Sequence, residues 1–158
     1  AQTLDGYIAK NAEHTPLEWT SKEDKQFFAE RTIEAGTIVL GENTYNTIRR
    51  ALPNRRNIVY TSQKELEGVE TTIEQPEDLL KKLEQEGTEE VAICGGSSIY
   101  TMFMKANLID KFYITLEPVV FGSGMSLFNE SVDTNLELVS STPLNSQGTL
   151  LLEYNVKK

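Results

Sequence analysis

The sequence has one cysteine, one histidine and no long hydrophobic run. Cys94 has no partner for an internal disulfide, which fits a reducing compartment, so we expect a cytoplasmic protein. One cysteine and one histidine do not supply the ligands of a structural zinc site, and we expect no metal. A membrane helix needs about 20 consecutive apolar residues. No run in this sequence approaches that length, so we expect no association with a membrane.

Positive charge is also scarce, with 15 Lys and Arg against 24 Asp and Glu and a net charge of −9. Nucleic acid is recognised through basic surface, so this balance excludes it as a partner and favours a small molecule. The basic residues nevertheless cluster at Arg49, Arg50, Arg55 and Arg56. This cluster is either a solvated surface loop or a local site for an anion, and the sequence does not separate the two.

A chain of 158 residues with 39% hydrophobic and 25% charged residues predicts one globular domain over residues 1–158. Apolar runs predict strands at 1–9, 37–40, 58–61, 91–94, 111–120, 136–142 and 149–156. Capping residues and apolar spacing predict helices at 22–34, 43–49, from Pro76 to the stop at Gly87, and at 97–107. This alternation predicts an α/β fold with a central, mostly parallel sheet, a C-terminal antiparallel hairpin and helices on both faces.

Two of the expected strands end in glycine just before a helix, at Leu40-Gly41 and at Cys94-Gly95-Gly96. Ligands bind at the carboxyl ends of strands in open α/β sheets, and a helix N-terminus favours phosphate. These two ends could hold the halves of a dinucleotide, whereas packing alone is an equal alternative for the glycines. The sequence has no Gly-x-Gly-x-x-Gly, which argues against a standard Rossmann domain.

Asp24 lies in the first turn of the expected helix at 22–34, on the same face as Phe28 and shortly after Trp19. Helix capping with Ser21 is the favoured explanation for an acid at this position. The alternative is an acid beside a pocket for a flat heterocycle, with Trp19 at its wall. The chain shows no hydrolytic triad, so a reaction that depends on a redox cofactor fits better.

Several motifs together resemble the dihydrofolate reductase family along nearly the whole chain. Trp19 is followed five residues later by Asp24 and then by Phe28, as are the family's tryptophan, substrate acid and aromatic residue. Gly41-x-x-Thr44-Tyr45 resembles its Gly-Arg-x-Thr-Trp motif, and Leu52-Pro53-Asn54-Arg55-Arg56-Asn57 its Leu-Pro-Gly-Arg-x-Asn segment. Gly95-Gly96 with Tyr100 resembles its cofactor turn, and Thr115 falls where the family has a threonine on a strand.

The resemblance implies that the protein reduces 7,8-dihydrofolate to tetrahydrofolate. NADPH, with NADH as the alternative, would deliver a hydride to C6, and N5 would be protonated. It assigns catalysis to Asp24, Trp19 and Thr115. It assigns substrate binding to Phe28, Ile48, Arg50, Leu52, Arg55, Cys94 and Tyr100, with Arg55 pairing with a carboxylate. It assigns cofactor binding to Ala1, Ile8, Ala9, Gly41, Asn43, Thr44, Thr61, Ser62, Gln63, Gly95, Gly96, Ser97, Ser98 and Ile99. Residues 9–18 would form a flexible loop over the nicotinamide, and a monomer is expected, with a dimer as the alternative.

Three segments depart from the family's pattern. Glu42 stands where the family usually has arginine, and we expect it to reduce the preference for NADPH over NADH. Residues 4–9 and 121–128 are closer to the pyrimidine reductase of riboflavin synthesis, which shares the fold and NADPH. Reduction of a ribosylaminopyrimidine is therefore one alternative function, and a non-catalytic nucleotide-binding domain is another.

Overall fold

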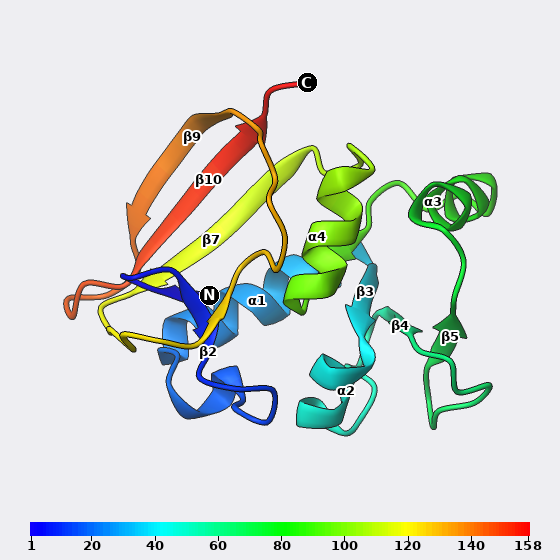
Figure 1. Cartoon of the computed structure of the whole chain (residues 1–158), viewed down its shortest axis with the longest axis horizontal. Coiled ribbons are helices and arrows are strands. Elements are labelled where there is room, and N and C mark those ends of the chain that lie inside the picture. Colours follow the sequence, from blue (N-terminus) through cyan, green and yellow to red (C-terminus); the bar gives the residue numbers. More distant parts are fainter. The chain divides into compact units, whose positions relative to one another are not determined.

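The computed structural model describes residues 1–158, which divide into two compact units (Figure 1). One unit comprises residues 1–28 and 109–158, and the other comprises residues 29–108. The expectation of one domain over residues 1–158 stays a prediction. None of the helices is long and apolar enough to span a membrane.

The first unit is built on a four-stranded sheet. The sheet has the order β1-β7-β10-β9, in which β1 is parallel to β7 and β10 is antiparallel to both of its neighbours. Figure 1 shows β7, β10 and β9 side by side. A second sheet pairs β2 with β8. The elements are β1 (Gln2–Thr3), β2 (Tyr7–Ala9), the short helix η1 (Pro16–Glu18), β7 (Lys111–Glu117), β8 (Met125–Ser126), β9 (Leu136–Pro143) and β10 (Leu150–Val156).

The second unit is built on a parallel sheet with the order β5-β4-β3-β6. Its strands are β3 (Thr37–Gly41), β4 (Arg56–Tyr60), β5 (Glu70–Thr72) and β6 (Ala92–Ile93). Its helices are α2 (Glu42–Ile48), α3 (Pro76–Gln85) and α4 (Ser97–Lys105), and α2 and α4 both contact β3. Helix α1 (Lys22–Ala35) begins in the first unit and ends in the second.

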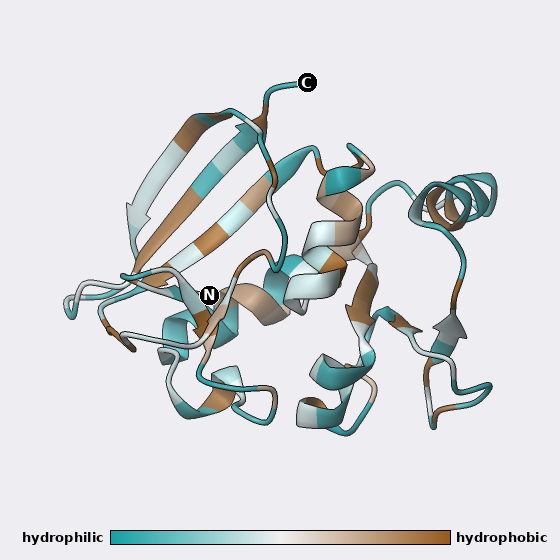
Figure 2. Cartoon of the chain, in the orientation of Figure 1, coloured by the Kyte–Doolittle hydropathy of each residue, from teal (hydrophilic) through white to brown (hydrophobic).

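The core of the second unit lies around β3, whose five residues are all buried. Ile38, Leu40, Tyr45 and Val59 form its central cluster, and Figure 2 shows β3 as a hydrophobic segment. Burial on both faces explains why β3 is continuously apolar rather than alternating. Helix α3 is amphipathic instead, because only one of its faces is buried. It buries Leu79 and Leu83 and turns polar residues toward solvent.

The predicted α/β class, the parallel strands, the four helices and the terminal hairpin are confirmed. Two strands were not predicted, β5 and β8, because each is only two or three residues long and has no apolar run. The strand expected at 1–9 is instead two short strands, β1 and β2, which belong to different sheets because a turn at Gly6 separates them. The strand expected at 58–61 begins earlier, since Arg56 already pairs with Thr37 in β3. It ends earlier as well, because the backbone of Thr61 leaves the ladder with β3 and donates to Thr72 O at 3.1 Å.

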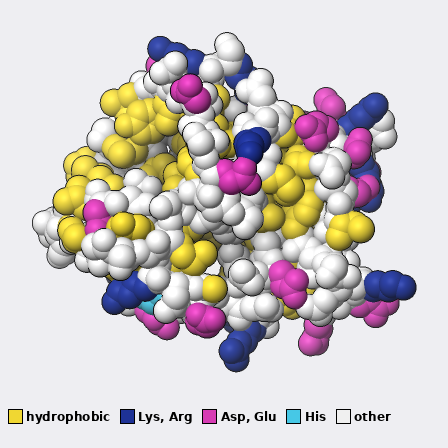
Figure 3. Space-filling view, viewed as in Figure 1, with side chains coloured by type: hydrophobic (Ala, Val, Ile, Leu, Met, Phe, Trp, Pro, Cys, Tyr) yellow, Lys and Arg dark blue, Asp and Glu magenta, His cyan; other side chains and the backbone are white.

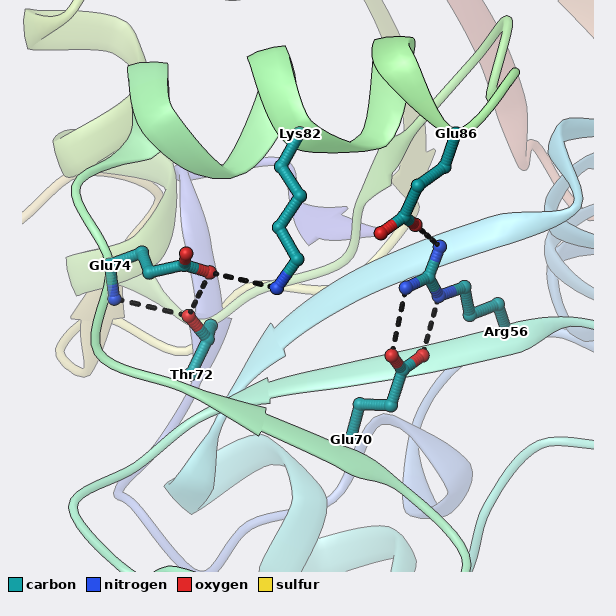
Figure 4. A network of polar contacts seen from close by, with 6 residues as sticks. All are labelled: Arg56, Glu70, Thr72, Glu74, Lys82 and Glu86. Atoms are coloured by element: carbon teal, nitrogen blue, oxygen red, sulfur yellow. Dashed lines mark hydrogen bonds and ion pairs between the residues drawn. The ribbon is translucent and has the colours of Figure 1, made fainter.

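Arg56, one of the four clustered arginines, is held in an ion-pair network at the surface (Figure 4). Its guanidinium donates to both carboxylate oxygens of Glu70, at 2.5 and 2.8 Å, and to Glu86 at 2.6 Å. Hydrogen bonds from Arg56 hold the pKa of Glu70 below its ordinary value. The anion-site hypothesis therefore does not extend to Arg56, whose donors already face two acids.

We expect Glu70→Gln to lower the free energy of unfolding at neutral pH by less than ~1 kcal/mol, because the pair is partly exposed. The depressed pKa means that this contribution is present above the pKa of an unfolded glutamate, about 4.3. It is lost as the pH falls through the lower folded value. Urea unfolding of both proteins at neutral and strongly acidic pH measures the difference. If the two proteins still differ in their free energy of unfolding at strongly acidic pH, the loss of stability comes from packing and not from the ion pair.

The edge strand β9 exposes apolar side chains, with Leu136, Leu138 and Val139 between 41% and 54% exposed. Hydrophobic side chains gather in the same region of the space-filling view (Figure 3). Leu136 and Leu138 lie two residues apart and point to the same face of the strand, whereas Glu137 between them points to the opposite face.

Candidate functional site

The parallel sheet reverses its strand order between β3 and β6. From β3 the chain proceeds to β4 and β5 on one side, and it returns to β6 on the other side. A crevice at the carboxyl ends of such a pair of strands is the usual ligand position in open α/β sheets. Two backbone bonds join these ends, from Cys94 N to Val39 O at 2.8 Å and from Gly41 N to Gly95 O at 2.7 Å. The sheet therefore places Gly41 and Gly95 together, as the resemblance implied.

The three glycines at this edge allow close approach of neighbouring groups. A Cβ on Gly41 would lie 3.0 Å from Ile99 Cγ1, and one on Gly96 would lie 3.4 Å from Thr44 Oγ1. Gly95 has a φ of 111°, and the peptide bond between Gly95 and Gly96 is cis. Packing against α4 explains Gly41 and also bears on Gly95, where a Cβ would lie 3.3 Å from the hydroxyl of Tyr100. Gly96 lies beside the hydroxyl of Thr44, just before the N-terminus of α4, a position suited to phosphate.

A carboxylate lies on the other side of β3 at the same sheet edge. Glu42 follows β3 directly, and its Oε2 accepts a hydrogen bond of 2.7 Å from Thr61 Oγ1. Its other oxygen accepts a hydrogen bond from the side-chain amide of Gln63. Both donors follow the end of β4, the strand beside β3. Three residues that the sequence linked to the cofactor thus form one hydrogen-bonded group.

Asp24 is a buried acid in the first unit. Its backbone N–H donates to Ser21 Oγ at 3.1 Å, which confirms the predicted cap, and its side chain is only 8% exposed. No hydrogen bond or ion pair within the protein engages its carboxylate. The Asp24 oxygens are not among the fully buried polar atoms that lack a partner, so they keep contact with solvent, and the cap through its backbone N–H leaves them unused. An acceptor in this state is suited to a ligand that carries N–H donors.

Other polar groups of this unit also lack partners within the protein. Trp19 Nε1 and Thr20 Oγ1 are buried and make no hydrogen bond, and the hydroxyl of Thr115 makes none either. Trp19 and Thr20 lie directly before α1, which carries Asp24. Trp19, Asp24 and Thr115 were predicted from the sequence as site residues, whereas Thr20 was not.

A second buried acid, Glu117, connects α1 to the sheet. Its Oε1 accepts from Ser21 N–H at 2.8 Å, and its Oε2 accepts from Thr149 Oγ1 at 2.8 Å. Glu117 ends β7 and lies two residues beyond Thr115, so both side chains point to the same face of the sheet. The hydrogen bond from Ser21 N–H to Glu117 anchors the start of α1, and with it Asp24, to β7, the strand that carries Thr115. Sequence analysis missed Glu117, although an acid at the end of an apolar strand was a signal.

An aromatic cluster surrounds Trp19. Its ring centroid lies 5.1 Å from that of Phe121 and 6.4 Å from that of His14. His14 belongs to the loop expected to cover the nicotinamide, and its Nδ1 accepts from Lys10 N–H at 3.1 Å. The ring contact of His14 therefore holds the loop against Trp19, and the hydrogen bond from Lys10 N–H to His14 joins two residues within the loop.

Arg55 differs from its neighbour Arg56 in having no acidic partner. Its guanidinium donates to Thr32 Oγ1 at 2.5 Å and to Pro53 O at 2.8 Å, and burial lowers its pKa. These two bonds hold the side chain in place and leave donors for another group, since a guanidinium carries five N–H donors. Such a cation is suited to a ligand carboxylate or phosphate.

The remaining predicted residues are divided between the two units. Ile48, Leu52 and Cys94 pack against the β3 core cluster, and burial raises the pKa of the Cys94 thiol to about 12. Phe28, at 37% exposed, lies in the first unit. Ala1, Ile8 and Ala9 also belong to the first unit, and Arg50, Asn43, Ser62, Ser97, Ser98, Ile99 and Tyr100 to the second. The roles that the resemblance gives to these residues stay predictions.

Comparison with known proteins identifies the class. A family model described as dihydrofolate reductase matches residues 1–149. The dihydrofolate reductase of Bacillus subtilis (strain 168) is 35% identical over 136 residues, which cover 84% of this chain and 74% of that protein. The structure of dihydrofolate reductase from Enterococcus faecalis complexed with NADP(H) and RAB-propyl has a TM-score of 0.77 at 28% identity. That match covers 99% of this chain and 93% of the other.

A candidate riboflavin biosynthesis protein from Shewanella sp. PV-4 is similar in fold, with a TM-score of 0.84 at 23% identity. The match covers 99% of this chain and 96% of that one. Fold and comparisons together define an α/β reductase. The chain belongs to the dihydrofolate reductase family.

Proposed function

We propose that the protein reduces 7,8-dihydrofolate to tetrahydrofolate with a reduced nicotinamide dinucleotide. The observation that carries this proposal is the buried Asp24 carboxylate, which no group of the protein engages. A pterin ring offers adjacent donors, the 2-amino group and N3, to such an acceptor. Capping, packing and ion pairing leave the same carboxylate unexplained.

The residues at the sheet edge fit a dinucleotide. Gly95, Gly96 and Thr44 lie together directly before the N-terminus of α4 and form a phosphate cradle. A Cβ on Gly95 or Gly96 would narrow this cradle, because it would approach the hydroxyl of Thr44. These groups, with Ser97 and Ser98, would hold the phosphates. When bound, the reduced nicotinamide supplies the hydride for C6 of the substrate. The dinucleotide class is therefore part of the proposal.

The protein's own residues would bind and polarise the substrate. Asp24 would accept hydrogen bonds from the 2-amino group and N3, and its negative charge would favour protonation at N5. Trp19 Nε1, an unused buried donor, is available for a ring oxygen or a water beside it. Arg55 would bind the carboxylate of the glutamate tail through its free donors.

Reduction of a ribosylaminopyrimidine is the second candidate, because residues 4–9 and 121–128 resemble the riboflavin-pathway enzyme. The structure gives these segments a shared structural role. Asp5 accepts hydrogen bonds from Phe121 N at 3.2 Å and Gly122 N at 2.7 Å, and a bond from Thr3 lowers its pKa. Contact between the two segments accounts for their joint presence without reference to the substrate, so dihydrofolate remains the favoured substrate.

Spectrophotometric assay of dinucleotide oxidation tests the proposal. We expect oxidation that requires dihydrofolate, with either NADH or NADPH as donor. Oxidation with a ribosylaminopyrimidine alone would instead support the second candidate. Tight dinucleotide binding without oxidation in either assay would support a non-catalytic nucleotide-binding domain.

A further inference from the structure

The Glu42 carboxylate lies at the carboxyl edge of the parallel sheet, directly after Gly41. It is half-buried, it follows β3 directly, and it has no Lys or Arg as ion-pair partner. Its two oxygens accept from the hydroxyl of Thr61 and the side-chain amide of Gln63. Thr61 is 7% exposed, so the carboxylate is fixed by a buried donor and is not a freely moving surface acid.

The order of groups along this edge places Glu42 beside the phosphate cradle. Gly95 and Gly96 follow β6, and Thr44 on α2 approaches Gly96 from the side of β3. Glu42 precedes Thr44 by two residues and faces the end of β4, where Thr61 lies. A dinucleotide whose diphosphate rests on the cradle has one ribose on each side of it, and we assign the adenosine ribose to the side of Glu42.

The chemistry at this position distinguishes the two nicotinamide dinucleotides. An ionised carboxylate has about four acceptor positions, of which Thr61 and Gln63 use two. The others can accept from the 2′- and 3′-hydroxyls of a ribose, which is how an acid selects the unphosphorylated ribose in other dinucleotide sites. A 2′-phosphate would meet the negative charge of Glu42. Thr61 and Gln63, the donors that it would need, already donate to that same carboxylate.

We propose that Glu42 makes this site selective for a free ribose 2′-hydroxyl, so that NADH is the preferred cofactor over NADPH. The inference rests on the proposed function, because that function places a dinucleotide at this edge. It predicts a reversal of the cofactor preference and not only a reduced preference for NADPH, since Glu42 repels the 2′-phosphate and also engages the donors of Thr61 and Gln63.

Binding measurements without substrate test the selectivity. We expect calorimetric titration to show NADH binding at least about tenfold more tightly than NADPH, and 5′-ADP more tightly than 2′,5′-ADP. Glu42→Gln removes the negative charge, and we expect the difference between the affinities for NADH and NADPH to become smaller. Glu42→Arg supplies a cation, and we expect the preference to reverse. Glu65→Gln, at an exposed acid of the segment after β4, is the control for a change of net charge and should keep the wild-type ratio.

The outcomes separate this inference from the proposed function. Tighter binding of NADPH by the wild type, with dihydrofolate-dependent oxidation intact, would overturn the selectivity alone. An unchanged ratio in Glu42→Gln would show that the charge does not select. Failure of both dinucleotides and of both ADP probes to bind would overturn the inference together with the proposed cofactor. Circular dichroism of each variant establishes folding, and Glu42→Gln carries the test if the arginine variant unfolds.

Discussion

Replacing Asp24 with asparagine should lower kcat/KM for dihydrofolate by about 100-fold or more, the range of a lost acid–base group. The side chain keeps its size, so α1 and its cap remain. The negative charge that favours protonation of the substrate is removed, and one acceptor becomes an NH₂ donor facing the donors of the pterin. Steady-state kinetics measure the loss, and titration with the dinucleotide should give an unchanged dissociation constant.

Asp78→Asn is a matched control, since Asp78 is the third residue of α3 as Asp24 is the third residue of α1. Asp78 is exposed, and its substitution should leave the kinetics unchanged. Full activity in Asp24→Asn would remove Asp24 from catalysis. Equal losses in the two variants would point to a general effect of charge.

Replacing Glu117 with leucine should reduce the free energy of unfolding by about 3 kcal/mol or more. The substitution leaves two donors without acceptors, the N–H of Ser21 and the hydroxyl of Thr149, and each buried unsatisfied group costs about 1–3 kcal/mol. Because Ser21 N–H fixes the start of α1, Asp24 loses its anchor to the sheet. Urea unfolding measures the stability, and kinetics on the folded fraction should show a raised KM and a lowered kcat.

Glu117→Gln separates positioning from charge. Its amide oxygen can still accept from Ser21 N–H, so we expect it to retain most of the stability and activity. Thr149→Val removes the bond to Glu117 Oε2 and also the bond that Thr149 Oγ1 accepts from Asn145 Nδ2 at 2.9 Å, so it should cost about 2 kcal/mol with little effect on KM. Glu117 is a positioning residue only if the glutamine variant restores activity. A glutamine variant as inactive as the leucine variant would show that the negative charge itself is required.

The sequence was informative where local chemistry is strong. Ser21 caps α1, Gly36 ends it, and β3 is continuously apolar because it is buried on both faces. Short elements escaped prediction because their stability comes from neighbours. The strands β5 and β8 have no apolar pattern of their own, and pairing with β4 and β2 defines them. Arg55 and Arg56 are adjacent and chemically identical, and only the fold gives one of them two acidic partners.

The sequence by itself determined the α/β class and most element positions, which follow from spacing and residue type and are local properties. The grouping of Gly41, Gly95 and Asp24 into one reductase site comes from the resemblance to a family, and the roles of these residues stay predictions. The tertiary structure decided which polar groups have partners. It left Asp24 without one, directed Thr61 and Gln63 onto Glu42, and anchored α1 through Glu117. Hydrogen bonds between distant segments depend on strand order and register, and no spacing along the chain encodes them directly.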